Sequence, residues 1–478
     1  MIALLLVTLP LVAALAVRFA PLRGRAGSWL VVTAALETVL AAIAVAMPSD
    51  GAATLGGYVR LDATSRLFLA VIDPIFLGIT IHVAHRVRTA PELRPELERH
   101  ASLALGFLGC CNAVLVSNHF MVMWIALEAT TLAAAPLIMR PGLASSARAS
   151  WHYLLFSVVG LGLLLLGLLC ITRGLADSGA EPTLLVDRLL VIAPLGTGAW
   201  IRLGISLCLL GLGTKLGLAP MYSWLPETYD EAPPAVAALL GAVQFNCAFV
   251  VLLRILQVFR HEHAPLVKGI LVALGTLSMV VSTLSIIATF NLKRLVAYAS
   301  INHAGVLAIG LGVGKPASYG LLLYAVSNAF TKAILFLTIG KIKAHYRTKD
   351  TRQIAGLIRD LPYSGMFLML GTFALLGFPP FSSFFGELLI LSALVSSGHM
   401  LVFTVFCVLI TATFVATGRT VFPMIWGEPK EVRTWPRQTL LSAAPKLAFL
   451  AALVVLGIYI PPAVNTLLEQ VAASLETP

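Results

Sequence analysis

The sequence carries little charge for its length. Only 12% of its 478 residues are Asp, Glu, Lys or Arg, whereas 59% are hydrophobic and the mean hydropathy is +0.92. Soluble domains average about 25% charged and about 45–50% apolar residues. An aqueous fold could not bury this much apolar surface, so we expect lipid to be the main solvent. The net charge of +11 does not indicate nucleic-acid binding, because the basic residues are confined to the segments between apolar runs.

The sequence also lacks the common signatures of metal, nucleotide and disulfide sites. It has no C-x-x-C pair, no P-loop and no G-x-G-x-x-G after a strand. Its cysteines lie in apolar runs, where they are typical small core residues. We therefore expect no metal, no cofactor, no iron–sulfur cluster and no catalytic centre within this chain. The cysteines are Cys110, Cys111, Cys170, Cys208, Cys247 and Cys407.

Long apolar segments run from one end of the chain to the other. A membrane-spanning helix needs about 20 mostly apolar residues, and the backbone must satisfy its own hydrogen bonds in lipid, which favours helices. The first segment lacks the basic start of a cleaved signal, so we expect it to be a membrane helix. The sequence predicts an all-α polytopic protein with about fourteen spans, near 2–21, 28–47, 66–87, 101–117, 119–139, 151–173, 201–222, 234–256, 265–290, 294–313, 317–340, 364–395, 401–424 and 443–465.

The basic residues predict an orientation in the membrane. Of the 33 Lys and Arg residues, 22 fall in predicted loops after odd-numbered spans, Lys446 among them, and 9 fall after even-numbered spans, Arg254 among them. Loops rich in Lys and Arg stay on the inner side. We therefore expect both termini on the outer side of the membrane.

An internal repeat interrupts two of the predicted spans. Residues 217–225 read GLAPMYSWL and residues 377–385 read GFPPFSSFF, which share the pattern G-x-x-P-x-x-S-aromatic. Proline and glycine break helices. Paired interrupted helices indicate a transport site built from repeats, although two packing kinks would give the same pattern. The predicted breaks lie at Pro220, Pro379 and Pro380.

Four ionisable residues lie well inside apolar spans. Such groups are costly in lipid and indicate function. The pKa of a buried lysine is lowered by desolvation and restored by a nearby carboxylate, so a glutamate that approaches and retreats would make the lysine a switchable proton site. We predict that Glu128 tunes Lys215 in this way, that Lys332 relays protons and that Glu387 is the exit carboxylate. We also expect these four groups at similar membrane depth, with polar cavities beside them.

Several other polar residues have weaker or alternative interpretations. His303 and His152 suit proton relays because histidine titrates near neutral pH. Lys293 is as compatible with an interfacial lysine as with a relay. Asp73 precedes Pro74, which favours a role in capping or in stabilising a kink, and Glu37 is as compatible with a partner subunit as with a paired arginine.

Five sequence segments resemble one family of membrane proteins. They are WIALEATTLAAAPLI, GTKLGLAPMYSWLPETYDEAPPAVAALL, FNLKRLVAYASINHAG, NAFTKAILFL and GFPPFSSFFGELLIL. In this order they resemble the antiporter-like subunits of complex I, Mrp antiporters and group 4 hydrogenases, in particular component F of hydrogenase-4. The resemblance extends over nearly the whole chain.

The resemblance implies fourteen helices with two inverted five-helix repeats. The corresponding divisions are 1–100 (helices 1–3), 101–256 (first repeat), 265–424 (second repeat) and 425–478 (helix 14 and tail). It implies proton-related roles for a glutamate in helix 5, lysines in helices 7 and 11, and a charged residue in helix 12. In this sequence those positions are Glu128, Lys215, Lys332 and Glu387. The long lateral helix of some members should be absent.

Three positions depart from the family pattern. Gly241 and Ala242 stand where relatives often have a histidine in helix 8, and Asn328 stands where they often have one before the helix 11 lysine. His152 replaces a helix 6 lysine. These departures affect the expected relay.

The function expected from the resemblance is proton translocation, driven by other membrane subunits of a redox complex. The alternatives are a proton-conducting partner of an inorganic-carbon uptake complex and an Mrp-type cation/proton antiporter subunit. Sodium therefore remains open beside protons as the transported ion.

Overall fold

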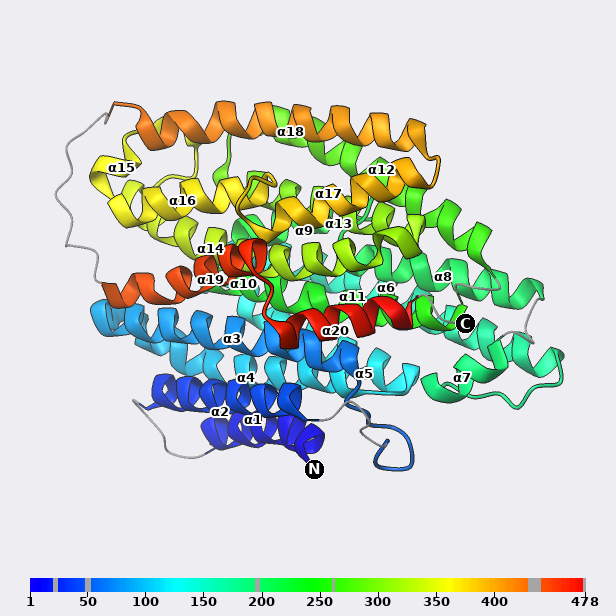
Figure 1. Ribbon diagram of the computed structural model, residues 1–478. Helices are drawn as coiled ribbons and strands as arrows, with labels where there is room; N and C mark the ends of the chain where they lie inside the picture. The colour runs from blue at the N-terminus through cyan, green and yellow to red at the C-terminus, as the bar shows by residue number, and fades with distance from the viewer. Residues whose placement is uncertain (20–24, 48–52, 194–197, 260–262, 429–439, 476–478) are drawn as a thin grey trace.

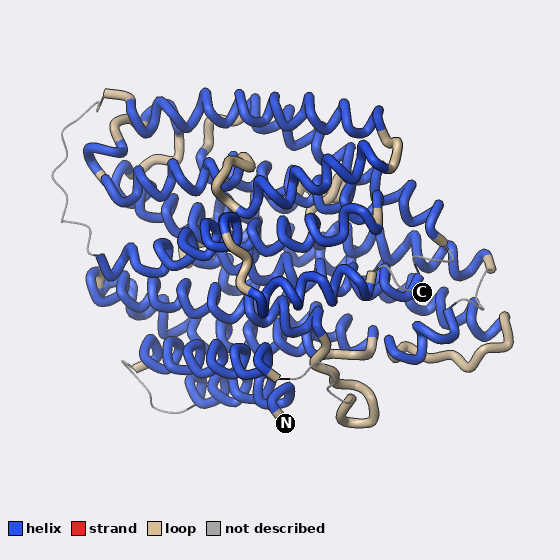
Figure 2. Tube along the Cα trace, viewed as in Figure 1, coloured by secondary structure: helices blue, strands red, loops and turns tan. Residues whose placement is uncertain are grey.

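The computed structural model describes all residues except 20–24, 48–52, 194–197, 260–262, 429–439 and 476–478. Its described elements are helices joined by loops (Figure 2). The helices run roughly parallel or antiparallel to one another in a single bundle, with α1 and α2 at one edge and α18 at the opposite edge (Figure 1). Many exposed side chains along these helices are large and apolar. The protein is therefore an integral membrane protein with many spans.

The first half of the chain contains the helices that were predicted up to residue 256, together with short helices outside the predicted spans. The elements are α1 (Ile2–Phe19), α2 (Ala26–Ala46), α3 (Ala63–Thr89), η1 (Pro91–Leu93), α4 (Arg94–Val116), α5 (Phe120–Ile138), α6 (Ala144–Asp177), α7 (Val186–Ile192), α8 (Ala199–Leu216), α9 (Trp224–Glu231), α10 (Pro234–Ala238), the π-helical turn η3 (Leu239–Gln244) and α11 (Phe245–Phe259).

The second half contains two further pairs of helices that meet at a break. The elements are α12 (Ala264–Ala288), α13 (Leu292–Val313), η4 (Lys315–Ala317), α14 (Ser318–Tyr346), η5 (Thr351–Gln353), α15 (Leu357–Asp360), α16 (Pro362–Leu375), α17 (Ser382–Ser396), α18 (Met400–Trp426), α19 (Leu440–Ile458) and α20 (Pro462–Ser474).

Within the described ranges, twelve helices are long and apolar enough to cross a membrane. The number rises to thirteen if the bent pair α19 and α20 is one span. That pair was predicted as one continuous segment, 443–465, but it bends by 71°. The bend lies where Pro461 and Pro462 interrupt the hydrogen-bond ladder.

Several basic residues that were assigned to loops lie inside helices, and two of them are far from the predicted loops. Arg254 is in α11 and Lys446 is in α19, and both are buried. The prediction was wrong for both, because a charge count treats a cation as the end of an apolar run. Arg254 has a carboxylate partner, and the Lys446 ammonium lies 5.0 Å from the centre of the Phe367 ring. Such contacts keep a cation inside a helix bundle.

Close contacts between glycines hold α6 against α8 and α12 against α13. A Cβ on Gly160 of α6 would lie 3.0 Å from the carbonyl oxygen of Gly211 in α8, and Gly275 of α12 and Gly305 of α13 approach each other's carbonyls in the same way. Small residues permit such close packing of membrane helices. The contact between α6 and α8 brings the end of α8 against polar side chains of α6.

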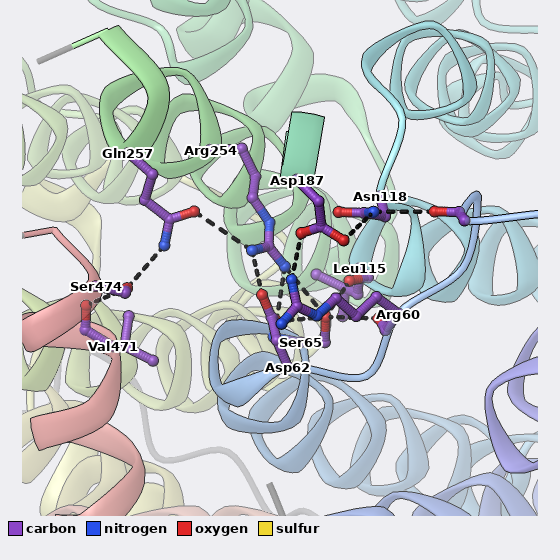
Figure 3. Close-up of polar contacts among 11 residues, drawn as sticks. Arg60, Asp62, Ser65, Leu115, Asn118, Asp187, Arg254, Gln257, Val471 and Ser474 are labelled. Atoms are coloured by element: carbon purple, nitrogen blue, oxygen red, sulfur yellow. Dashed lines mark hydrogen bonds and ion pairs between the residues drawn. The ribbon is translucent and has the colours of Figure 1, made fainter. Parts of the chain in front are cut away.

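A buried ion pair ties several helices together at one end of the bundle (Figure 3). Asp62, the N-cap of α3, accepts hydrogen bonds from the Arg254 guanidinium and from the Ser65 amide. Gln257, one turn after Arg254, donates to Ser474 of α20 at 2.8 Å. Although burial raises the pKa of Asp62, attraction to Arg254 and the hydrogen bonds outweigh it and lower the pKa to about 2.

We expect Asp62→Asn to destabilise the protein by at least about 2 kcal/mol at neutral pH. The size of the effect follows from the lowered pKa of Asp62, at about 1.4 kcal/mol per unit. Because the folded-state pKa is below the unfolded value, this stabilisation is complete above about pH 4 and is lost as the pH falls towards 2. Unfolding of the purified protein in detergent, followed against pH, measures it.

Asp350→Asn provides the control for this prediction. Its partner Arg352 has a side chain that is 66% exposed, so the substitution should cost less than about 1 kcal/mol. Equal losses in the two variants would contradict a special role for Asp62.

Candidate functional site

Lys215 lies in a cage of neutral hydroxyl groups. It is the last residue but one of α8 and is only 5% exposed. Its ammonium donates to Thr131 Oγ1 of α5 at 2.6 Å, to Ser157 Oγ of α6 at 3.2 Å and to the Tyr153 hydroxyl at 3.3 Å. The three N–H donors of an ammonium are thus matched by three oxygens. The cage satisfies the hydrogen bonds of Lys215 without an adjacent negative charge.

Tyr153, one of the three cage residues, also connects Lys215 to the π-helical turn η3. The Tyr153 hydroxyl donates to Gln244 Oε1 at 2.9 Å, and Gln244 Nε2 donates to Thr130 Oγ1 at 2.9 Å. Gln244 is the last residue of the π-helical turn η3, and such turns are frequent at functional sites. A continuous path of hydrogen bonds therefore joins Lys215 to η3.

Glu128 lies on the same face of α5 as Thr131, three residues earlier. The Glu128 carboxylate interacts electrostatically with Lys215, but no ion pair joins the two in the described part of the chain. Its buried Oε2 has no hydrogen-bond partner among the described residues. Thr131, and not Glu128, is thus the residue of α5 that contacts the ammonium directly.

Lys332 is the second buried lysine, and its surroundings differ from those of Lys215. It lies in α14 and is 0% exposed. Its Nζ lies 4.0 Å from the centre of the Phe245 ring and has no hydrogen-bond partner among the described residues. Gly241 packs against its alkyl chain, since a Cβ there would lie in van der Waals contact with Lys332 Cδ, at 3.4 Å. A cation–π contact is thus its main polar contact.

Two consecutive residues of one helix therefore reach the two lysines. Gln244 connects to Lys215 through Tyr153, and Phe245 lies against Lys332. The helix formed by α10, η3 and α11 therefore touches the surroundings of both lysines.

His303 and Glu387 lie around a small cavity in the second half of the chain. His303 Nδ1 and the Tyr324 hydroxyl are 2.5 Å apart, and the ring also bonds to the backbone of Leu375 at the end of α16. The cavity has a volume of about 20 Å³, and its lining includes His303, Tyr324, Asn302 and Glu387. That volume is sufficient for a water molecule among polar partners.

The two interrupted helices have the same local geometry. Gly217 and Gly377 have positive φ angles of 74° and 65°, as expected where a helix ends in the left-handed region. The residue after each glycine donates its backbone N–H five residues back, from Leu218 to Gly213 and from Phe378 to Phe373. Pro220 lies in the link between α8 and α9, and Pro379 and Pro380 lie in the link between α16 and α17.

At each break, a side chain adds a second hydrogen bond to a carbonyl that already accepts one from the backbone N–H of the glycine. Trp224 Nε1 donates to the Thr214 carbonyl at 3.0 Å, and Ser383 Oγ donates to the Ala374 carbonyl at 2.6 Å. Thr214 and Ala374 occupy the same place in the two motifs, three residues before the glycine. Each break is thus a stable, hydrogen-bonded structure rather than a frayed end.

Sequence reasoning missed a carboxylate that partners His152. His152 Nδ1 lies 2.6 Å from Glu227 Oε2, and both side chains are partly exposed. Glu227 follows Gly217 by ten residues, just as Glu387 follows Gly377. Extending the repeat by two residues beyond the matched nine would have found it.

Lys293 is a third buried lysine and lies in the first turn of α13. Its ammonium donates to the backbone carbonyls of Asp230 and Ala232, each at 2.7 Å. The Asp230 carboxylate in turn binds Arg294 and Lys349. This group links α9 to α13 and to the segment after α14, and these contacts account for the burial of Lys293.

The profile of the family described as "NADH:quinone oxidoreductase/Mrp antiporter, TM" matches residues 117–414. A hydrogenase-4 component F homolog of Methylacidiphilum infernorum is 28% identical over 86% of this chain and 87% of its own length. A Na(+)/H(+) antiporter subunit of Bacillus subtilis is 26% identical over 87% of this chain and 86% of its own length.

A solved structure shows the same fold. A chain of the membrane-bound sulfane sulfur reductase, an archaeal respiratory membrane complex, superposes with a TM-score of 0.89, covering 99% of this chain and 97% of that chain at 23% identity.

Proposed function

Because the chain belongs to the NADH:quinone oxidoreductase/Mrp antiporter family, we propose that it is a proton-translocating subunit of an energy-converting respiratory complex. Partner subunits would carry the redox chemistry, and this chain would move the protons. The proposed route consists of Glu128, Lys215, Lys332, His303 and Glu387.

The placement of the two lysines is the observation that carries this proposal. Both are buried, and consecutive residues of one helix, Gln244 and Phe245, reach their surroundings. A structural lysine in lipid would be expected to have a carboxylate partner or to reach the interface. Neither arrangement applies to Lys215 or Lys332 in the described structure.

The hydroxyl cage of Lys215 suits a group that gains and loses a proton. A hydroxyl can accept a hydrogen bond from an ammonium and can also donate one to a neutral amine. The cage can therefore hold either form of Lys215 after small rotations of Thr131 and Ser157. Movement of the Glu128 carboxylate towards or away from Lys215 would then shift the balance between the two forms.

The proposed architecture has fourteen crossings and two inverted five-helix repeats, 101–256 and 265–424. In it, α16 and α17 form one interrupted span, as α8 and α9 do. The matching hydrogen-bond patterns after Gly217 and Gly377 support this pairing. We further propose that both termini face the outer side of a bacterial or archaeal plasma membrane, and that the proton-carrying groups lie at similar depth.

His152 and Lys293 take secondary places in the proposal. The pair of His152 and Glu227 is positioned for proton exchange at the surface of the first half, because the two side chains are in contact and both are partly exposed. Lys293 is held by backbone carbonyls, which favours an anchoring role over a relay.

A second candidate function is that of a component of a cation/proton antiporter. The similarity to the Na(+)/H(+) antiporter protein of Bacillus subtilis favours it. The two candidates share the proton route and differ in the partners and in the need for sodium.

Purification of the tagged chain with its native partners tests the proposal. We expect redox subunits to copurify, and we expect vesicles containing the complex to move protons when an electron donor is supplied, with or without sodium. Glu128→Gln should remove most of this movement. Glu92→Gln, which alters an exposed carboxylate in η1, should leave it unchanged.

Strict dependence on sodium, with no redox partner, would favour the antiporter instead. Wild-type proton movement in Glu128→Gln would contradict the proposed route.

A further inference from the structure

Two buried carboxyl groups, outside the proposed route, lie near one another between α2, α3 and α4 and interact electrostatically. Glu37 of α2, Asp73 of α3 and Asn112 of α4 are all 0% exposed. Asn112 Nδ2 donates to Glu37 Oε2 at 3.2 Å and to the Leu6 carbonyl of α1 at 3.0 Å. The Asn112 side chain also lies beside Asp73. In the described structure, Glu37 is neither paired with an arginine nor exposed at a surface where a partner subunit could bind.

The group has more acceptor oxygens than donors. Four buried oxygens have no hydrogen-bond partner among the described residues: Glu37 Oε1, both carboxylate oxygens of Asp73 and Asn112 Oδ1. No lysine, arginine or histidine of the described ranges forms an ion pair with either carboxylate. Two ionised carboxylates in such surroundings would be strongly unfavourable. The group therefore requires a bound positive charge.

We propose that Glu37, Asp73 and Asn112 form a proton-binding site. A proton held between the two carboxyl groups removes most of their mutual repulsion, as it does wherever two carboxylates share one position. Asn112 orients Glu37 by donating to Oε2, which leaves Oε1 for the proton. A hard metal cation fits less well, because such ions take about six or more oxygen ligands and four are free here.

The site lies beside the Lys215 end of the proton route. Cys111, adjacent to Asn112 in α4, lies near both Asp73 and Lys215. The Cys247 thiol of α11 in turn approaches the Cys111 carbonyl at 3.9 Å. The carboxyl groups of Glu37 and Asp73 thus extend the row of buried titratable groups into the N-terminal helices. Its participation in translocation rests on the function proposed above, whereas proton binding itself does not.

Infrared spectroscopy of the protein in lipid vesicles at neutral pH tests proton binding. Protonated carboxyl groups absorb separately from carboxylates, and their band shifts in heavy water. We expect the double variant Glu37→Gln/Asp73→Asn to lose part of the protonated-carboxyl band. Asp62→Asn should leave the band unchanged, because Arg254 keeps Asp62 ionised. An unchanged band in the double variant would overturn the proposal, as would loss of the wild-type band on addition of sodium chloride.

A second measurement needs no variant. Dicyclohexylcarbodiimide reacts with protonated carboxyl groups in apolar surroundings, so the wild-type protein should be labelled at Glu37 or Asp73 and not at Asp62. Peptide mass spectrometry locates the label. Absence of label at both residues would count against the site.

Proton movement in the same vesicles separates this proposal from the proposed function. If the double variant loses the infrared band and most proton movement, the site lies on the route. If it loses the band but moves protons normally while Lys215→Ala does not, the extension of the route is wrong. If Lys215→Ala also moves protons normally, the proposed function itself has failed.

Discussion

Lys215→Ala is expected to reduce coupled proton movement by at least about tenfold while the protein still assembles. A group through which every proton passes leaves no parallel route when it is removed. The substitution leaves the hydroxyl groups of Thr131, Tyr153 and Ser157 in place, and hydroxyls can bond to one another or to water. Proton movement in reconstituted vesicles measures the loss, and copurification of the partners checks assembly.

Two further variants sharpen the test of Lys215. Tyr153→Phe keeps the ring and two of the three oxygen partners but cuts the link to Gln244, so a partial loss is expected. Lys446→Ala removes another buried lysine, which lies against Phe367 and outside the route. If Lys446→Ala reduced proton movement as much as Lys215→Ala does, burial rather than position would explain the effect. Normal proton movement in Lys215→Ala would refute its role.

Lys332→Met is expected to stabilise the protein and to abolish proton movement. The Lys332 ammonium has no hydrogen-bond partner among the described residues, and an unsatisfied buried donor costs about 1–3 kcal/mol. Methionine has similar length, and its thioether packs well against an aromatic ring such as Phe245. The midpoint of unfolding should therefore rise as function is lost, which is the opposite of the effect of most core substitutions.

Leu335→Met is the matched control, because Leu335 is a neighbouring residue of α14 that is equally buried. It should leave both stability and proton movement nearly unchanged. A functional Lys332→Met variant would exclude Lys332 from the route. A destabilised one would show that the ammonium contributes binding energy that its described contacts do not explain.

The sequence predicted the positions of helices better than the contacts of buried side chains. Apolar length located α5 within one residue at each end, from a predicted 119–139 to Phe120–Ile138, because lipid imposes that length on a helix. Glycine and proline located the links at Pro220 and Pro380, because their backbone restrictions are local. Both properties can be read from a single segment of the chain.

What surrounds a buried charge could not be predicted in this way. The hydroxyl partners of Lys215 come from α5 and α6, 58 to 84 residues away in the chain, and serines and threonines are common in any membrane helix. The association of Glu37 with Asp73 was missed for the same reason. The π-helical turn at Leu239–Gln244 has no proline and one glycine, so no breaker pattern marked it.

That π-helical turn also sets the rotational phase of everything that follows it. Each residue advances an α-helix by about 100°, so one residue more or fewer in η3 would turn α11 by that angle. Arg254 would then point away from Asp62, and Gln257 away from Ser474. The turn that directs Gln244 towards one lysine and Phe245 towards the other therefore also aligns an ion pair at the far end of the helix. With a single-residue insertion or deletion in η3, the contacts around the two lysines and the contacts of Arg254 and Gln257 could not form at the same time.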